Sequence, residues 1–316
     1  MVIGAPKCGT TSLYANLKAH PQIAAPASKE LCFFSPFKRY IQRNRPLPSS
    51  NWNLYTASFA GTSAYMHAEQ ALGIVRGRRR SRPEFVQGRR LQQGSTNCEA
   101  RQLHAFEACP FYLGEVEAAT MIHTVFPSLH LVAILRNPRE RTISAFNDYV
   151  RMGRIRGRNA SALGMDALVR QKISMLERGE RGLEDFDMRI LTSGCYIHGL
   201  EEWGRVWPTA QLLVLRSEDM FYDTAKTMGR LHSFLGLEQQ PQRNWGVSNR
   251  GTKKAAASNS LDGVLDAFFA PYNARLYAWA DQRGLRFERW PNATEAPVVS
   301  APTPQRRRSP VELRVL

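Results

Sequence analysis

The sequence predicts an α/β fold of three layers, in which helices flank a mostly parallel central sheet. Three observations lead to this prediction. An apolar strand, a glycine loop and a helix open the chain at residues 2–19, and the apolar run Leu131–Leu135 precedes a turn and another helix. A further apolar run, Gln211–Arg216, follows an aromatic segment of helical pattern. Apolar runs of strand length that alternate with helices are typical of parallel sheets, because the crossover helices cover both faces.

The first turn, at residues 4–12, has the composition of a loop that binds an anion. Glycines let backbone N–H groups converge, and the following helix adds its positive N-terminal end and hydroxyl donors. The candidate ligands of a phosphate or sulfate group are Lys7, Cys8, Gly9, Thr10, Thr11 and Ser12. The spacing is P-loop-like, but Thr10 stands where a nucleoside-triphosphate loop has lysine, which points away from kinases and ATPases. An ordinary glycine turn at a helix start is the alternative.

A second candidate anion site follows the run Leu131–Leu135. Arg136 ends the strand, Asn137-Pro138 forms a turn, and Ser144 lies on the next helix, so an arginine and a serine can converge on one phosphate. A solvated helix start rich in arginine is the alternative. Together with the lysine loop, this segment resembles the sulfotransferase family, whose enzymes use 3′-phosphoadenosine 5′-phosphosulfate (PAPS). The resemblance implies that the loop holds the 5′-phosphosulfate and that Arg136 and Ser144 hold the 3′-phosphate.

Glu30 is the candidate general base. It lies in Lys29–Phe34, expected as a short extended segment, which is similar to the Lys/Asn-Glu-x-x-Phe-Phe segment of the Golgi heparan and chondroitin sulfotransferases. The resemblance implies that Glu30 deprotonates the acceptor and that Lys7 stabilises the charge that develops on the donor. A carboxylate suits this role because a hydroxyl must lose its proton as it attacks sulfur. A surface glutamate that only pairs with Lys29 is the alternative.

Two later segments also resemble the family. A basic glycine loop is similar to the third PAPS segment, which adds the candidate ligands Arg250, Gly251, Thr252, Lys253 and Lys254. A solvated basic loop is the alternative there. Gly114-Glu115 resembles the Gly-Glu that opens the second strand-loop of the family, but the usual Thr/Ser-Pro-x-Tyr does not follow it. We therefore assign no substrate contacts to that position.

The composition fits an enzyme that acts on acidic substrates. The chain has 316 residues, of which 43% are hydrophobic, enough for one large core. We expect one domain at residues 1–290, with a basic, poorly structured insertion at 74–100, and a disordered tail at 291–316. A net charge of +16 attracts polyanions such as sulfated glycans, nucleic acids or acidic membranes, and the charge alone does not choose among them. The resemblance implies PAPS as donor without a metal, an acidic glycan as acceptor, and no nucleic-acid partner.

The cysteines predict no metal site. The five of them form an odd set without paired metal spacing. We expect buried thiols, with a disulfide between Cys98 and Cys109 as the alternative.

The sequence shows no membrane span or secretory signal. No apolar run approaches the roughly 20 residues that cross a bilayer. Only Met1-Val2-Ile3 precede the loop, whereas a central strand usually has about five or six residues. We therefore expect a truncated N-terminus, with any membrane anchor lost. A Golgi location is implied by the resemblance alone.

The sequence thus predicts a PAPS-dependent sulfotransferase that modifies a hydroxyl or amine of a glycosaminoglycan or another polysaccharide. Two alternatives stay open at this point. A noncatalytic polyanion-binding protein on the same fold would explain the charge. A P-loop kinase would need a magnesium-binding acid after an apolar strand, whereas the strand at 131–135 ends in Arg136.

Overall fold

The computed structural model describes residues 1–26, 29–35, 104–183, 185, 188–240 and 259–290. The chain divides into two compact units, which we describe separately. The first unit comprises Met1–Arg136 and His198–Gly251, and the second comprises Asn137–Ile197 and Thr252–Leu316. The predicted insertion at 74–100 and the predicted tail at 291–316 lie outside the described residues, as do Cys98 and the basic loop at 250–254.

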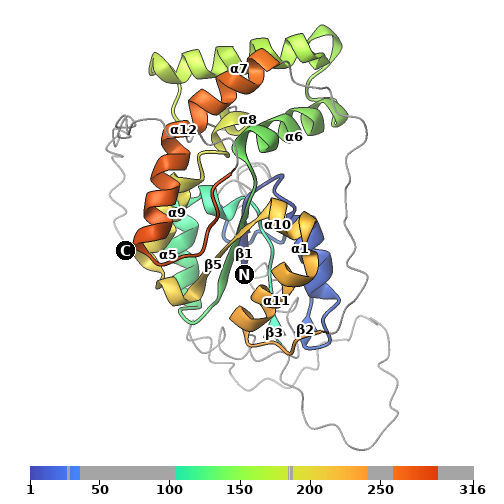
Figure 1. The fold of residues 1–316 in the computed structure, drawn as a ribbon, viewed down its shortest axis with the longest axis vertical. Helices are drawn as coiled ribbons and strands as arrows, with labels where there is room; N and C mark the ends of the chain where they lie inside the picture. Colours follow the sequence, from blue (N-terminus) through green and yellow to red (C-terminus); the bar gives the residue numbers. More distant parts are fainter. Residues whose placement is uncertain (27–28, 36–103, 184, 186–187, 241–258, 291–316) are drawn as a thin grey trace, which may run out of the picture. The chain divides into compact units, whose positions relative to one another are not determined.

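The first unit is built on a parallel sheet. Its three strands have the order β1-β4-β5, with bounds Val2–Gly4, Leu131–Leu135 and Leu212–Arg216. Every residue of β4 is buried, as expected for a central strand covered on both faces. Figure 1 shows α1, α10 and α11 on one side of the strands and α5 and α9 on the other. The bounds are α1 Thr10–Lys18, α5 Val116–Val125, α9 Tyr196–Val206, α10 Ser217–Tyr222 and α11 Thr224–Leu235.

The predicted α/β class and the parallel sheet are therefore confirmed.

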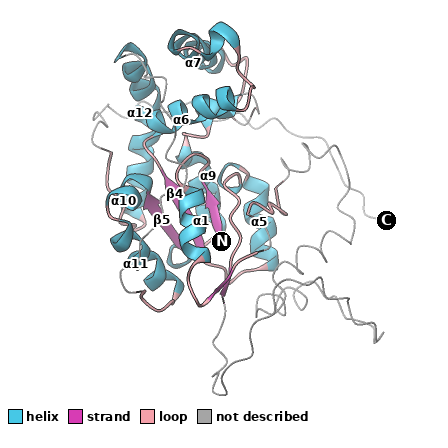
Figure 2. Cartoon of the chain, turned by 90° about the vertical axis from the view of Figure 1, so that its right-hand side faces the viewer, coloured by secondary structure: helices cyan, strands magenta, loops and turns pink. Residues whose placement is uncertain are grey.

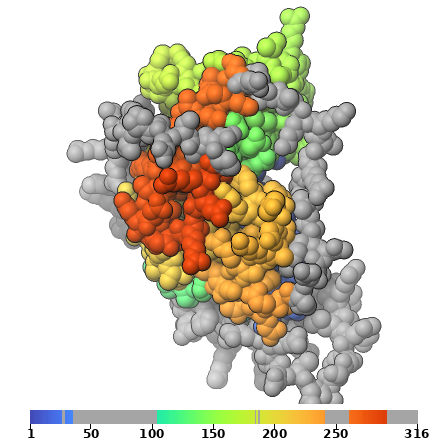
Figure 3. Space-filling model, in the orientation of Figure 1, coloured from blue at the N-terminus to red at the C-terminus, as the bar shows by residue number. Residues whose placement is uncertain are grey.

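Figure 2 shows α1 in front of the magenta strands, and Figure 3 shows α10 and α11, in gold to orange, forming one continuous surface on the face in view. The 3₁₀ helix η4, Thr209–Gln211, leads into β5. Among the described residues, no helix has both the length and the apolar character needed to cross a membrane.

A second, two-stranded parallel sheet pairs β2 with β3, at Ile23–Ala24 and His104–Ala105. The chain then runs beside β1. The amide of Val2 donates to the carbonyl of Glu107 at 2.8 Å, and the amide of Cys109 donates to the carbonyl of Val2 at 3.0 Å. The 3₁₀ helix η1, Tyr112–Gly114, ends this stretch. Residues 107–109 are thus hydrogen-bonded to the strand that leads into the lysine loop.

The described part of the second unit is helical. Its elements are α6 Pro138–Arg151, η2 Gly157–Ala160, α7 Ala162–Glu177, α8 Arg189–Thr192 and α12 Asn259–Gln282. The start of α6 follows from local sequence, because the Asn137 side chain accepts bonds from the amides of Arg139 and Glu140, and Pro138 occupies the first turn. Arg139 Nη1 donates to Asp266 Oδ2 at 2.6 Å, which joins α6 to α12.

One expected element is wrong. Lys29–Phe34 is not extended, because Glu30 and Cys32 have φ values of 63° and 49°, in the left-handed region. L-residues rarely adopt this region unless the surroundings impose it. Residues distant in sequence hold this segment, so local pattern could not predict its shape.

Candidate active site

The lysine loop joins β1 to α1 in a conformation that depends on glycine. Gly9 is the N-cap residue of α1 and has φ 88°, and within the described part of the chain no side chain donates or accepts a capping hydrogen bond at this helix end. A Cβ at Gly9 would lie 3.1 Å from Met220 Cε and 3.1 Å from Phe221 Cζ, on α10. A glycine is therefore required by both the backbone angle and the limited space. A helix start carries a positive partial charge and N–H groups that favour an anion.

The other candidates of this loop differ in exposure. Lys7 is half-buried and has φ 68°, so the backbone at the candidate charge donor is also left-handed. Thr10 and Ser12 are buried, and Thr11 is half-buried. Cys8 is fully buried, its Sγ lies 3.6 Å from the carbonyl of Pro6, and its amide donates to the carbonyl of Ala5 at 3.3 Å, so these bonds of Cys8 hold the turn itself.

Arg136 lies at the same edge of the sheet as the loop. It directly follows β4, which pairs in parallel with β1, and the carboxyl ends of parallel strands meet at one edge. Ser144 is half-buried on α6 in the second unit, so its position relative to the loop is not described. Arg141, on the same helix, is buried and donates to the carbonyl of Ile190 at 2.7 Å, which gives it a structural role.

Ser217 is a residue that sequence reasoning missed. It follows β5 at the same edge, is fully buried, and its Oγ has no hydrogen-bond partner among the described residues. A Cβ at Gly9 would lie 3.4 Å from this oxygen. A buried hydroxyl without a partner is unfavourable. Ser217 is therefore a candidate donor to a group bound at the loop, and only its tertiary contact with Gly9 reveals this.

Glu30 combines an ion pair with an accessible side chain. Its carboxylate pairs with the Lys29 ammonium, as the alternative interpretation expected, and 40% of the side chain is exposed. A carboxylate that is partly exposed can still be reached by an acceptor. The ion pair therefore does not decide between a surface role and a catalytic role.

The cysteines differ from the expectation. Cys32, two residues after Glu30, forms a disulfide with Cys109, so the alternative pairing of Cys109 with Cys98 is wrong, and the expectation of buried thiols is wrong for these two residues. Cys8 and Cys195 are buried free thiols, as expected. The bonded pair is 77 residues apart in sequence, and spacing alone cannot identify such partners.

The comparisons with known proteins decide the family. A family model described as the sulfotransferase family matches residues 1–241. The chain belongs to the sulfotransferase family. Human carbohydrate sulfotransferase 15 is 25% identical over 328 residues, which cover 87% of this chain and 52% of that protein. The bifunctional heparan sulfate N-deacetylase/N-sulfotransferase of Drosophila melanogaster is 25% identical over 241 residues, 75% of this chain and 19% of that protein.

A solved sulfotransferase structure has the same fold. The crystal structure of the sulfotransferase from Alicyclobacillus acidocaldarius superposes with a TM-score of 0.57 at 23% identity, and the match covers 90% of this chain and 95% of that one. The chain spans about half the length of the human carbohydrate sulfotransferase 15 that it matches. The predicted family and the P-loop-like fold are thus confirmed.

The residues of the loop fit the donor that sulfotransferases use. PAPS presents a phosphosulfate and a 3′-phosphate, both anionic. Positive charge and hydrogen-bond donors gather at one edge of the sheet, supplied by Lys7, Arg136, the hydroxyls at the start of α1 and the hydroxyl of Ser217. Gly9 itself carries no side chain, and the absence of a Cβ at such a turn lets backbone amides approach a ligand closely. These positive charges and hydrogen-bond donors therefore suit the anionic groups of PAPS.

Proposed function

We propose that this sulfotransferase-family chain transfers the sulfuryl group of PAPS to a hydroxyl or amine of an acidic glycan, with a glycosaminoglycan as the first candidate. One observation carries the proposal: the glycine-dependent lysine loop and Arg136 lie at the same edge of a parallel sheet in a family member. The net charge of +16 favours an acidic acceptor. The printed names of the relatives, carbohydrate and heparan sulfate sulfotransferases, support the same acceptor class.

Each residue has a distinct part in this proposal. The loop at Lys7–Ser12 holds the phosphosulfate, and Arg136 holds the 3′-phosphate. Ser144 and the basic loop at 250–254 stay predicted ligands of the same donor. Glu30 takes the proton of the acceptor while the acceptor oxygen or nitrogen bonds to sulfur and the bond from sulfur to the bridging phosphate oxygen breaks. Lys7 and the loop amides stabilise the negative charge left on that oxygen. No residue of this scheme requires a metal.

The proposal also predicts an oxidising compartment. The disulfide between Cys32 and Cys109 would persist in such a compartment, and the Golgi lumen is the one that we propose. The alternative function, that of a P-loop kinase, has no comparable support, because the family model that matches the chain describes sulfotransferases.

The deciding experiment measures sulfation and donor binding in the same preparations. Purified wild-type chain is incubated with PAPS and with chondroitin or heparan, and binding of adenosine 3′,5′-bisphosphate is titrated by calorimetry with and without magnesium. We expect transfer and metal-independent binding. Lys7→Ala should lower turnover by about 10²- to 10³-fold, and Glu30→Gln by about 10²- to 10⁴-fold.

Glu180→Gln is the matched control for Glu30→Gln. Glu180 is also a partly exposed, ion-paired glutamate, bonded to Arg178, but it lies in the second unit. Its replacement should leave turnover unchanged. Glycan binding that does not depend on PAPS or on Lys7, without any transfer, would instead establish the noncatalytic polyanion-binding alternative.

A further inference from the structure

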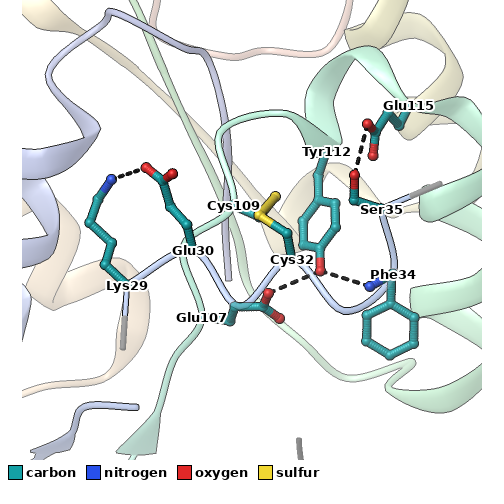
Figure 4. Close-up of a disulfide and its surroundings, with 9 residues drawn as sticks. All are labelled: Lys29, Glu30, Cys32, Phe34, Ser35, Glu107, Cys109, Tyr112 and Glu115. Atoms are coloured by element: carbon teal, nitrogen blue, oxygen red, sulfur yellow. Dashed lines mark hydrogen bonds and ion pairs between the residues drawn. A yellow bond between two sulfur atoms is a disulfide. The ribbon is translucent and has the colours of Figure 1, made fainter. Parts of the chain in front are cut away.

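The Glu30 segment, defined as residues 29–35, is held by buried contacts that the catalytic proposal does not use. Figure 4 shows these contacts, all made to the anchor segment, residues 107–115. The Cys32–Cys109 disulfide is the covalent one. The amide of Phe34 donates to Tyr112 Oη at 3.0 Å, and Tyr112 Oη donates to Glu107 Oε1 at 3.0 Å. Both ends of this relay are buried.

A second hydrogen bond holds the end of the Glu30 segment. Ser35 Oγ donates to Glu115 Oε1 at 2.9 Å, and both residues are buried. Burial and the nearby carboxylates raise the pKa of Tyr112 well above its usual range. Tyr112 therefore keeps its proton at neutral pH, and its hydroxyl can accept from Phe34 while donating to Glu107. Buried bonds of this kind are strong because water cannot compete for them.

The anchor segment connects the Glu30 segment to the lysine loop. Residues 107–109 run beside β1 through bonds between Val2 and both Glu107 and Cys109, and β1 leads directly to Lys7. The carbonyl of Tyr112 also accepts from Trp203 Nε1 at 3.1 Å, which fixes the anchor segment to the buried side of α9. The segments that carry the two candidate catalytic residues are thereby both joined to β1.

The backbone angles of the Glu30 segment indicate that contacts with the anchor segment hold its shape. Glu30 and Cys32 both have left-handed φ, a conformation that persists only where surrounding contacts impose it. We expect that, without the anchor contacts, this segment relaxes toward ordinary angles and the Glu30 carboxylate changes direction. Misplacement of a catalytic group by even about 1 Å can cost about 100-fold in rate.

We propose that Tyr112 is a positioning residue, which acts together with Glu115 and the Cys32–Cys109 disulfide. These groups hold the Glu30 segment against the strand that leads to Lys7, so that the Glu30 carboxylate is preorganised for proton transfer. This inference rests on the proposed role of Glu30 as general base.

The test replaces the Tyr112 hydroxyl alone. Tyr112→Phe keeps the ring and removes the bonds to Phe34 and Glu107. We expect kcat for sulfation to fall about 10- to 100-fold, while the Kd of adenosine 3′,5′-bisphosphate changes by less than about threefold because the lysine loop is untouched. Glu115→Gln keeps an acceptor for Ser35, so it should lower kcat less than Glu115→Ala.

Tyr277→Phe is the matched control. Tyr277 Oη is also buried and accepts a backbone amide, that of Trp290 at 3.1 Å, but it lies in the second unit. This variant should lose a hydrogen bond of the same kind and leave kcat unchanged. Equal loss of kcat in both variants would mean a general effect on stability and would overturn the positioning role.

A double variant separates this inference from the proposed function. If Tyr112 acts through Glu30, then Tyr112→Phe should lower kcat no further in the Glu30→Gln background. Near-normal turnover in Glu30→Gln alone would overturn the assignment of the base, and with it this inference. If Glu30→Gln strongly lowers kcat while Tyr112→Phe keeps the kcat of the wild type, only the positioning role is overturned.

Amide hydrogen exchange supplies a readout that needs no activity. We expect Tyr112→Phe to speed exchange within residues 29–35 at least about tenfold and to leave the peptide at residues 7–13 unchanged. Unchanged exchange in residues 29–35 would overturn the inference, whatever the enzyme's activity.

Discussion

Cys32 is bonded to Cys109 across 77 positions of sequence, and this disulfide lies two residues from the candidate base Glu30. A crosslink that closes so long a loop strongly restricts the unfolded chain. It also ties the Glu30 segment to the anchor segment beside β1. It therefore contributes both to stability and to the geometry of the candidate site.

Loss of this disulfide should destabilise the protein. We expect the Cys32→Ala/Cys109→Ala variant to lose about 2–4 kcal/mol of unfolding free energy, because the unfolded chain regains loop entropy. Urea denaturation measures the change. The control is Cys195→Ala, which removes a buried free thiol and breaks no crosslink. Equal stability of the double variant and the wild type under oxidising conditions would contradict the bond.

Gly9→Ala should impair both folding and donor binding. The new methyl group would meet Met220 and Phe221 in a backbone with φ 88°, so we expect a cost of about 1–3 kcal/mol. Gly236→Ala is the control, since Gly236 has φ 67° and open space around its Cβ position. Calorimetry should show weaker binding of adenosine 3′,5′-bisphosphate for Gly9→Ala only. Equal binding by the two variants would argue against the loop as the donor site.

Ser217→Ala should separate binding from stability. Its hydroxyl is buried and has no hydrogen-bond partner in the parts of the chain that the structure describes, so its removal should leave the unfolding free energy unchanged or raise it by up to about 1 kcal/mol. Donor affinity should nevertheless fall, because the hydroxyl is then missing from the loop site. Thr142→Val is the contrasting variant. Its buried hydroxyl donates to the carbonyl of Pro138 at 2.9 Å, so this change should cost about 1 kcal/mol. Unaltered donor affinity in Ser217→Ala would remove Ser217 from the site.

Arg136→Ala should weaken donor binding by about tenfold or more, because a charge-assisted bond to phosphate is lost. Arg136→Lys should recover part of this loss. The control is Arg205→Ala on α9, whose guanidinium is exposed and paired with Glu202. If titration of adenosine 3′,5′-bisphosphate gives the same Kd for Arg136→Ala as for Arg205→Ala, the 3′-phosphate contact lies elsewhere.

His232 should make stability depend on acidity. Burial, with a smaller contribution from the neighbouring His20, lowers the pKa of His232 from 6.5 to about 4, and the two rings are 4.8 Å apart. The unfolded state therefore binds a proton at a higher pH than the folded state does. Stability is then retained above pH 6.5 and lost as the pH falls from 6.5 toward 4.

Chemical denaturation at several pH values tests this. The wild type should lose more unfolding free energy than His232→Gln between about pH 7 and pH 4.5, by about 1 kcal/mol or more. His123→Gln, on α5, controls for replacing a histidine. Parallel pH curves for the wild type and His232→Gln would contradict the shift.

Much of the fold and part of the site could be predicted from the sequence, because their signals are local. The apolar run Leu131–Leu135 is long enough for a buried strand, and Asn137-Pro138 starts the next helix through its own side chain and ring. The glycines and hydroxyls of residues 4–12 likewise specify a strand, a turn and a helix start within one short segment. Such patterns depend on neighbours a few positions away, so no tertiary information is needed to recognise them.

Only the tertiary structure decided which distant groups meet. It paired Cys32 with Cys109, bonded the amide of Phe34 to the Tyr112 hydroxyl, and brought Ser217 to Gly9. Glu30 and Cys32 have left-handed angles that their residue types do not favour, so the sequence pattern predicted an extended segment there. Parallel pairing and buried hydrogen bonds join residues far apart in the chain, and sequence periodicity carries no record of these partners.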